Sequence, residues 1–318
     1  MDACSSHPCV HGMCSLSSSG YVCSCLSGFT GLNCDTRFGG PGILSPGDCV
    51  VSPWGQWSAV AGFGSQDRQR VVVKQQSPGG KLCPPLSENQ SCGPNCQATN
   101  LVSNFMTPTG LGSTGYGKLR DLLIILDSSG SIGPSDFDNA KTQLSRLVGM
   151  FCPTPDPFAG DHQRAALLVF DHGVNEIFDF DDMHDTNEVQ AKIRSVFYHG
   201  GGSRTDLALE YARTHMLTAT KGMRFRADVK QEILLITDGI SSVPAETLKE
   251  AYQLQQYAKV YALAIGVRTP AGQNEITNCV SSPPNRHIFS IPGFDDLKTL
   301  VDEIQRQLQH AQCARFQY

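Results

Sequence analysis

The stretch Leu119–Gly133 constrains the fold most, because it joins a fully apolar run to a loop that is rich in side-chain oxygens. Within it, residues Leu122–Leu126 are all aliphatic, which is typical of a central strand buried on both faces of a parallel sheet. The loop after this run carries Asp127, Ser129 and Ser131 at alternate positions. The stretch therefore predicts a buried strand whose carboxyl end leads into a polar loop and then a helix.

Strand-like and helix-like patterns alternate from residue 118 onward, which is typical of an α/β, doubly wound parallel sheet with helices on both faces. After the first strand, further strands are expected over 165–170, 174–178, 232–237, 260–266 and 286–291. Helices are expected over 137–151, 187–197, 205–217, 244–257 and 294–310. In such a sheet, ligands bind beyond the carboxyl ends of the strands.

Side-chain oxygens gather at two of those strand ends. Asp127, Ser129 and Ser131 follow the first strand, and Asp238 follows the strand over 232–237. Carboxylates and hydroxyls are hard ligands, which suit Mg²⁺ better than Zn²⁺ or copper. The simpler alternative is that Asp127 and Ser129 only cap the next helix and hold no metal.

Three segments together resemble the von Willebrand factor A domain and the related integrin I domain. They are Asp127-x-Ser-x-Ser131, Gly200-Gly-Gly-Ser-Arg-Thr-Asp-Leu-Ala-Leu209 and Thr237-Asp-Gly239. The resemblance implies a metal-ion-dependent adhesion site with Mg²⁺ as the cofactor, or Mn²⁺ in vitro. In that family, one coordination position stays open for a Glu or Asp of a partner protein.

The resemblance also implies a role for each oxygen ligand. Ser129 and Ser131 are expected to bind the metal directly, whereas Asp127 and Asp238 act through water. The ligand from the middle segment is either Ser203, which aligns with the first hydroxyl of the family pattern, or Thr205. The acidic run of 179–182 is interpreted as a solvated loop rather than a calcium site.

Cysteine usage divides the chain, because ten of the 13 cysteines lie in the first 96 residues. A segment this dense in cysteine depends on disulfides, which require an oxidising compartment. The net charge of -5 gives no attraction to nucleic acid or to an anionic membrane. No apolar run reaches the roughly 18 residues of a membrane-spanning helix. We expect a secreted, extracellular protein whose signal peptide has been removed or is missing from this sequence.

Residues 1–35 contain six cysteines and end in Cys25-Leu-Ser-Gly-Phe-Thr-Gly-Leu-Asn-Cys34, which closely resembles an epidermal-growth-factor-like (EGF-like) module. The spacing alone leaves all fifteen pairings of six cysteines open. The resemblance implies the pairs Cys4–Cys14, Cys9–Cys23 and Cys25–Cys34, without bound calcium. Ser6 lies in an O-glucose pattern, and an unmodified serine is the alternative. The Gly- and Pro-rich residues 36–48 are expected to be a linker.

Residues 49–96 resemble a thrombospondin type 1 repeat in the pair Trp54-Gly-Gln-Trp57 followed by Asp67-Arg-Gln-Arg70. The resemblance implies a stack in which Trp54 and Trp57 interleave with Arg68 and Arg70. Trp54 also lies in a C-mannosylation pattern, and Asn89 is the acceptor of an N-glycosylation sequon. The small module is interpreted as a spacer, and a groove for sulfated glycans is the alternative.

The thrombospondin-like segment departs from its family, because the usual Cys-Ser-x-x-Cys after the second Trp is absent. Four cysteines remain: Cys49, Cys83, Cys92 and Cys96. Analogy with one subgroup of the family implies the pairs Cys49–Cys83 and Cys92–Cys96. The polar residues 97–117 are expected to be a second linker or an extension of the large domain. The A domain is expected over 118–313, followed by a tail over 314–318.

The A domain has three cysteines of its own. In this fold the first long helix and the last helix are neighbours, so we expect a Cys152–Cys313 disulfide. Cys279 then stays unpaired, either buried in a helix before the last strand or available for an intermolecular disulfide that forms an oligomer.

These features together predict a secreted adhesion or matrix protein. Its A domain is expected to bind an acidic group of a protein ligand, with collagen and other matrix proteins as candidates. The alternative is a structural matrix or coat component that assembles through disulfides or glycans independently of metal. No Ser/His/Asp set, zinc spacing or phosphate loop is present, so we expect no enzyme.

Overall fold

The computed structural model describes residues 4–17, 20–26, 29–37, 47–58, 63–106, 119–150, 163–183 and 185–308. The chain divides into two compact units. One comprises Met1–Ser58 with Asp67–Asn89, and the other comprises Ala59–Gln66 with Gln90–Tyr318.

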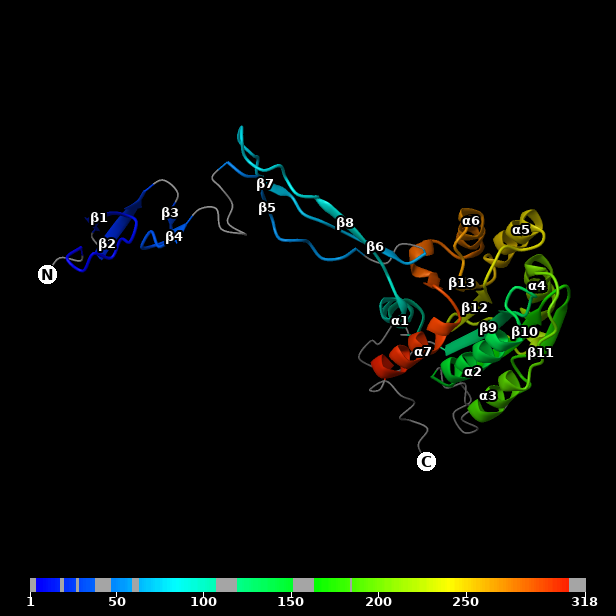
Figure 1. Ribbon diagram of the computed structural model, residues 1–318. Coiled ribbons are helices and arrows are strands. Elements are labelled where there is room, and N and C mark those ends of the chain that lie inside the picture. Colours follow the sequence, from blue (N-terminus) through cyan, green and yellow to red (C-terminus); the bar gives the residue numbers. More distant parts are fainter. Residues whose placement is uncertain are drawn as a thin grey trace, which may run out of the picture. The chain divides into compact units, whose positions relative to one another are not determined.

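A six-stranded sheet forms the centre of the larger unit, in the order β11-β10-β9-β12-β13-β14 (Figure 1). Its strands are β9 (Leu119–Asp127), β10 (Arg164–Phe170), β11 (Val174–Phe178), β12 (Val229–Thr237), β13 (Lys259–Ile265) and β14 (Ile288–Ile291). Neighbouring strands are parallel, except that β11 is antiparallel to β10. The predicted doubly wound sheet is therefore confirmed, and the strand expected over 174–178 is its antiparallel edge strand.

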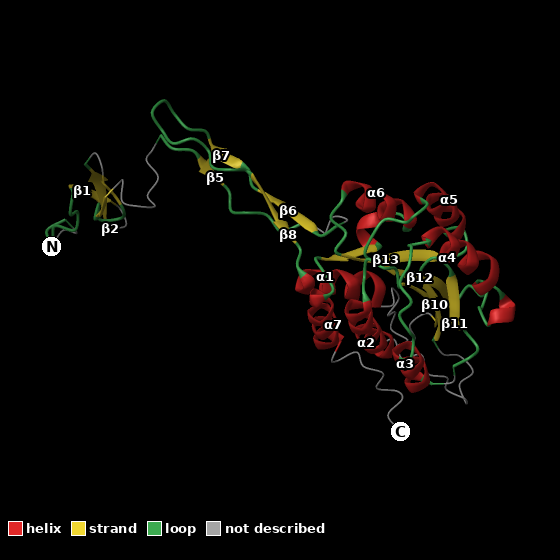
Figure 2. Ribbon diagram, turned by 45° about the vertical axis from the view of Figure 1, so that its right-hand side comes forward, coloured by secondary structure: helices red, strands yellow, loops and turns green. Residues whose placement is uncertain are grey.

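Helices cover both faces of this sheet (Figure 2). One face carries α1 (Pro94–Leu101), α2 (Pro134–Met150), α3 (Thr186–Arg194) and α7 (Asp295–Leu308). The other carries α4 (Thr205–Tyr211), α5 (Pro244–Leu254) and α6 (Pro270–Cys279). Shorter helical turns are η1 (Val102–Met106), η2 (Ala212–Met216), η3 (Ala219–Lys221) and η4 (Pro284–Arg286). Within the described ranges, every helix is too short or too polar to cross a bilayer.

The central strand β9 explains why both faces need helices. Successive side chains of a strand point to opposite faces. Leu122, Ile124 and Leu126 accordingly pack into one hydrophobic cluster with α2, α3 and α7. Leu123 and Ile125 pack into the other cluster with α4 and α5. The continuous apolar run in the sequence is thus typical of a strand that is buried on both faces of the sheet.

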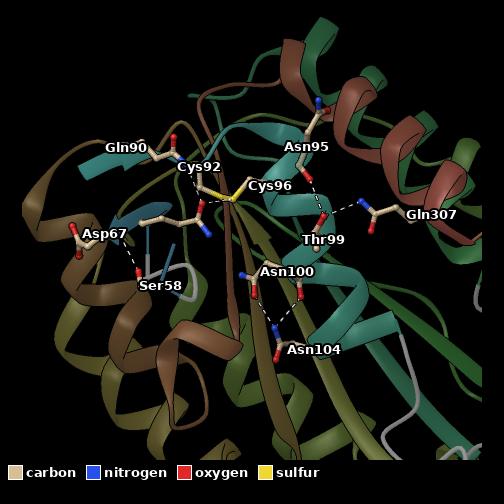
Figure 3. Close-up of a disulfide and its surroundings, with 11 residues drawn as sticks. Ser58, Asp67, Gln90, Cys92, Asn95, Cys96, Thr99, Asn100, Asn104 and Gln307 are labelled. Atoms are coloured by element: carbon tan, nitrogen blue, oxygen red, sulfur yellow. Dashed lines mark hydrogen bonds between the residues drawn. A yellow bond between two sulfur atoms is a disulfide. The ribbon is translucent and has the colours of Figure 1, made fainter. Parts of the chain in front are cut away.

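Residues 94–106 are part of the A-domain core. Helix α1 continues directly into the π-helical turn η1, and three apolar side chains of this segment are fully buried: Ala98, Leu101 and Phe105. Thr99 Oγ1 accepts a hydrogen bond of 2.9 Å from Gln307 Nε2 of α7 (Figure 3). A linker is therefore the wrong description of residues 97–106, which extend the large domain. Residues 107–118 lie outside the described residues.

The EGF-like module consists of two small antiparallel sheets. β1 (Gly12–Ser17) pairs with β2 (Gly20–Cys25), and β3 (Phe29–Thr30) pairs with β4 (Thr36–Arg37). The disulfides are Cys4–Cys14, Cys9–Cys23 and Cys25–Cys34, the same pairs that the resemblance implied. The ring of Phe29 stacks on His11 with centroids 3.9 Å apart, which fills the small module with an aromatic pair.

The linker expected over 36–48 is wrong at both ends. Residues 36 and 37 form β4 of the EGF-like module. At the other end, Asp48 is buried, and its Oδ1 accepts a hydrogen bond of 2.8 Å from Lys81 N of the next module. Residues 38–46 lie outside the described residues.

The thrombospondin-like segment is a thin ribbon of short strands. β5 (Val50–Val51) pairs with β7 (Val72–Lys74), and β6 (Ser65–Gln69) pairs with β8 (Ser87–Ser91). The Arg68 guanidinium carbon lies 5.0 Å from the Trp54 ring centroid and 4.5 Å from that of Trp57. Arg70 lies 4.1 Å from Trp54. The structure therefore contains the expected stack, in which each exposed contact contributes about 0.5–1 kcal/mol.

The remaining cysteines fall into three groups. Two disulfides form in the ribbon segment, Cys49–Cys83 and Cys92–Cys96, and Figure 3 shows the second at the start of α1. Cys279 ends α6 and is only 2% exposed, and burial raises the pKa of its thiol to about 12. A thiol enclosed in the core cannot reach a second folded chain, so the structure agrees with the alternative in which Cys279 is buried in the helix before the last strand and not with the intermolecular disulfide. The predicted Cys152–Cys313 bond lies outside the described residues.

Candidate metal centre

The loops after β9 and β12 bring the predicted oxygen ligands together at the carboxyl edge of the sheet. The two strands are parallel neighbours, so their ends lie side by side. Thr237 Oγ1 donates a hydrogen bond of 2.8 Å to Asp127 Oδ2, and Ser131 Oγ donates one of 3.1 Å to Asp238 Oδ1. The hydroxyl oxygens of Ser129 and Ser131 are 3.1 Å apart. Ser129 N donates a hydrogen bond of 2.8 Å to Asp127 Oδ1, so four of the six predicted ligands form one connected cluster.

The loop before α4 supplies the other two. Ser203 Oγ donates to Asp127 Oδ2 at 3.4 Å and lies 3.4 Å from Thr205 Oγ1. The backbone of Ser203 is fixed by Ser242, whose Oγ accepts from Ser203 N at 3.2 Å and whose N donates to Ser203 O at 2.7 Å. Both candidate hydroxyls therefore reach the cluster, and Ser203 makes the direct contact with Asp127.

A glycine allows these loops to approach. Gly201 has a φ of +119°, and a Cβ there would lie 2.8 Å from His172 Nδ1. Its carbonyl oxygen accepts a 2.8 Å hydrogen bond from Gly130 N, which joins the middle loop to the loop after β9. Tyr198 Oη adds a 3.3 Å bond to Ser129 O. Gly201 and Tyr198 thus position the site, although only the Gly-rich run was visible as a motif in the sequence.

The two carboxyl groups of the cluster are held in a low-dielectric setting. Burial is the main cause that raises the pKa of Asp127 to about 6, the charge of Asp238 raises it further, and hydrogen bonds from Ser129 and Thr237 oppose the rise. Burial also raises the pKa of Asp238. Within the described part of the chain, no cationic side chain contributes to either shift. A divalent cation would stabilise both ionised carboxylates, so the donor set fits such an ion.

Other acidic groups near the sheet have cationic partners of their own. Arg204 makes a bidentate ion pair with Asp206 at 2.8 and 2.7 Å, which lowers the pKa of that carboxyl. In the acidic loop, Asp181 pairs with Arg164, and Asp179 lies 3.4 Å from Lys221. Among the described residues, no group of three or more His, Cys, Asp or Glu side chains could hold a metal. The mixed carboxylate–hydroxyl cluster is therefore the candidate centre.

The predicted modification sites lie in the small modules. Ser6 is exposed, in agreement with a modifiable surface residue. Asn89 is exposed on β8, and its Nδ2 donates a 2.7 Å hydrogen bond to Asp67 Oδ1. Trp54 is half-buried under the two arginines of the stack. All three modifications stay predictions.

Comparison with known families matches two parts of the chain. The family model for the von Willebrand factor type A domain matches residues 121–303. The family model for the EGF-like domain matches residues 4–33. Residues 49–96 lie outside both matches, so their resemblance to a thrombospondin type 1 repeat stays a prediction that rests on the Trp/Arg stack.

Curated relatives include matrix proteins. Matrilin-1 of Homo sapiens is 24% identical over 262 residues, which cover 82% of this chain and 47% of that protein. Matrilin-2 of Mus musculus is 26% identical over 202 residues, which cover 62% of this chain and 20% of that protein. The collagen alpha-4(VI) chain of Mus musculus is 27% identical, with 59% and 8% covered. The chain therefore spans less than half the length of these relatives.

Solved structures share the fold of the large domain. One is proximal thread matrix protein 1 from the mussel byssus, whose structure has a zinc-occupied metal-ion-dependent adhesion site. The likeness covers 58% of this chain and 47% of that chain, with a TM-score of 0.52 and 20% sequence identity. At this identity the likeness establishes the shared fold.

Proposed function

Because the chain belongs to the von Willebrand factor type A domain family, we propose that it binds a protein ligand through a divalent metal ion at the candidate centre. One observation carries the proposal: six oxygen-bearing side chains from three loops meet at the carboxyl edge of the sheet. They are Asp127, Ser129, Ser131, Ser203, Thr205 and Asp238. The family membership and this geometry both support a metal site at the carboxyl edge of the sheet.

The donor set explains why the ligand should be acidic. Ser129, Ser131 and Ser203 would bind Mg²⁺ directly through neutral hydroxyl oxygens, while Asp127 and Asp238 supply negative charge through water. Mn²⁺ is expected to substitute in vitro. Neutral hydroxyl oxygens offset little of the ion's positive charge. The bound ion can therefore accept one carboxylate oxygen from a partner's Glu or Asp. Thr237 supports this role, because its hydroxyl holds the Asp127 carboxylate in place.

We propose a secreted adhesion or matrix role rather than an enzymatic one. The relatives named matrilin and collagen VI support this context. The five disulfides among the first 96 residues support an oxidising, extracellular setting. Extracellular matrix proteins, collagen among them, are the proposed partners, and the small modules would space the A domain from its neighbours.

Solid-phase binding to a panel of matrix proteins that includes fibrillar collagen tests this function. The chain is applied in Mg²⁺ and again in EDTA, with Asp127→Ala as the test variant. Glu210→Ala, which removes an exposed carboxylate from α4, is the matched control. The proposal expects binding in Mg²⁺ that EDTA and Asp127→Ala abolish and that Glu210→Ala retains. Binding that survives EDTA would instead favour the structural alternative, in which the modules assemble independently of metal.

A further inference from the structure

A second polar site lies at the other end of the sheet. A cavity of 630 Å³ opens at the amino ends of β12, β13 and β14, whereas the metal cluster lies at the carboxyl ends of β9 and β12. Its volume falls within the range of about 300–1,000 Å³ that small-ligand sites occupy. None of the candidate metal ligands lines it. We refer to it below as the amino-end groove.

Positive side chains concentrate in the amino-end groove. Lys230, Lys259 and Arg286 line it, although the whole chain carries a net charge of -5. Lys259 and Arg286 are exposed, and within the described ranges neither belongs to an ion pair. Both charges also help to lower the pKa of His287, after the larger effect of burial. The groove is therefore lined by positive charge, although the chain as a whole has a negative net charge.

The acidic residue of the groove does not oppose this charge. Glu232 is 3% exposed, and its carboxylate forms an ion pair with the guanidinium of Arg120, a residue that is itself 7% exposed. The guanidinium carbon of Arg120 lies 4.8 Å from the Phe105 ring centroid, which holds it against η1. Because Arg120 neutralises Glu232, an anion that entered the groove would meet a net positive lining.

The rest of the lining is rich in groups that hydrogen-bond to neutral polar ligands. Amide side chains line it at Asn104, Gln231, Gln255 and Gln256, and each amide nitrogen already donates to an oxygen of the chain, so a ligand hydroxyl would meet the amide oxygens. Tyr257 borders the groove with 55% of its surface exposed. An exposed aromatic ring offers an apolar face beside a polar rim. The groove thus combines cations, neutral hydrogen-bonding groups and one aromatic face.

We propose that the amino-end groove binds a sulfated or carboxylated oligosaccharide. The sulfate or carboxylate groups would pair with Lys259 and Arg286, since an arginine can bind such anions through two parallel hydrogen bonds. The amide oxygens would accept hydrogen bonds from the sugar hydroxyls, and the Tyr257 ring would lie against the apolar face of a sugar ring. An acidic peptide would satisfy the cations but would make less use of the tyrosine and the row of amides, so the glycan is the better match.

Titration calorimetry of the full chain with a heparin hexasaccharide tests this site, with EDTA present so that the metal centre is silent. The test variant is Lys259→Ser/Arg286→Ser. The matched control is Lys192→Ser/Arg268→Ser, which removes the same two charges from exposed positions outside the groove. The loss of two charge-assisted contacts is expected to raise the Kd at least tenfold, whereas the control changes it less than twofold.

Further comparisons make the result specific to a glycan. Tyr257→Ala, which leaves the charge unchanged, is expected to weaken binding about threefold or more, and the desulfated hexasaccharide is expected to bind at least tenfold more weakly. Equal weakening in both double variants, an absence of binding, or binding that needs Mg²⁺ would overturn the proposal. Tighter binding of a poly-glutamate peptide would also overturn it in favour of an acidic peptide. An unchanged circular dichroism spectrum checks that each variant is folded.

Discussion

Replacement of Asp127 by Asn should stabilise the metal-free chain while abolishing its stabilisation by metal. Burial raises the pKa of this carboxyl from 3.8 to about 6, so between these values the folded state binds a proton that the unfolded state has released. Stability of the metal-free chain is therefore expected to fall as pH rises from about 4 to about 6, and to stay low above that. Asn keeps the side-chain size, carries no charge and can still accept the 2.8 Å hydrogen bond from Ser129 N.

The size of the effect follows from the pKa shift. A rise of about two units corresponds to about 3 kcal/mol at about 1.4 kcal/mol per unit. This figure is an upper limit, because the Asn Nδ2 that takes the place of Oδ2 cannot accept the hydrogen bond that Thr237 Oγ1 donates to Asp127 Oδ2, a loss of about 0.5–1.5 kcal/mol. A net gain of about 1.5–2.5 kcal/mol remains. For a domain of about 150–250 residues this raises the melting temperature by about 3–10 °C.

Thermal unfolding followed by circular dichroism at 222 nm measures this directly. The helices in the described part of the chain begin at Pro94 or later, so the signal follows the A domain. In EDTA at pH 7.5 the variant should melt above the natural chain, and its advantage should shrink at pH 5. In Mg²⁺ only the natural chain should gain stability. A variant that melts below the natural chain in EDTA, or whose melting temperature still rises in Mg²⁺, would contradict the interpretation of Asp127 as a buried carboxylate that a bound cation stabilises.

Three further predictions concern single side chains. Ser203→Ala should weaken Mn²⁺ binding about tenfold and more than Thr205→Ala does, because Ser203 contacts Asp127 directly; calorimetry compares them, and the reverse order would assign the ligand to Thr205. Trp54→Ala removes two cation–π contacts and should destabilise the ribbon by about 1–2 kcal/mol; Trp57 fluorescence during urea unfolding reports it, and an unchanged midpoint contradicts it. Cys279 should resist a thiol reagent until denaturant is added, since it is 2% exposed; fast labelling of the native chain argues against this burial.

Much of the A domain could be predicted because its signals are local. The apolar run of β9 identifies a strand buried on both faces, since consecutive residues such as Leu122 and Leu123 must each face a helix layer. The alternate oxygens Asp127, Ser129 and Ser131 identify the functional edge of the sheet, because they follow immediately after that strand. The end of the strand and the oxygen ligands that follow it lie within a few residues of each other, so both can be predicted from one short stretch of sequence.

The contacts that complete the site depend on residues far apart in the chain. The bond between Thr237 and Asp127 spans 110 positions, and the one between Tyr198 and Ser129 spans 69. No periodic sequence pattern predicts these hydrogen-bonded pairs, because only the packed sheet and its loops bring the two residues together. The Gly201–Gly130 backbone bond likewise depends on a loop path that the Gly-rich motif permits but does not define.

Helix α1 was hidden by its polar composition. Its sequence Pro-Asn-Cys-Gln-Ala-Thr-Asn-Leu contains no charged residue and few apolar ones, so the sequence predicts no helix here and divides the segment between the thrombospondin-like residues 49–96 and a linker or extension from 97. The apolar residues Ala98, Leu101 and Phe105 nevertheless recur at spacings of three and four, which is the helical rhythm. The segment is stabilised by burial against α7 and the sheet rather than by its own helix propensity, and propensity alone therefore missed it.

Anomalous diffraction from a crystal of this chain soaked in Mn²⁺ tests the central claim most directly. We expect one strong manganese peak within bonding distance of the hydroxyl oxygens of Ser129 and Ser131, with Ser203 as the third direct ligand. A crystal of Ser129→Ala soaked in the same way should lose that peak. An absence of manganese between these loops, or a peak only at the acidic loop around Asp181, would contradict a metal-dependent adhesion site in this chain.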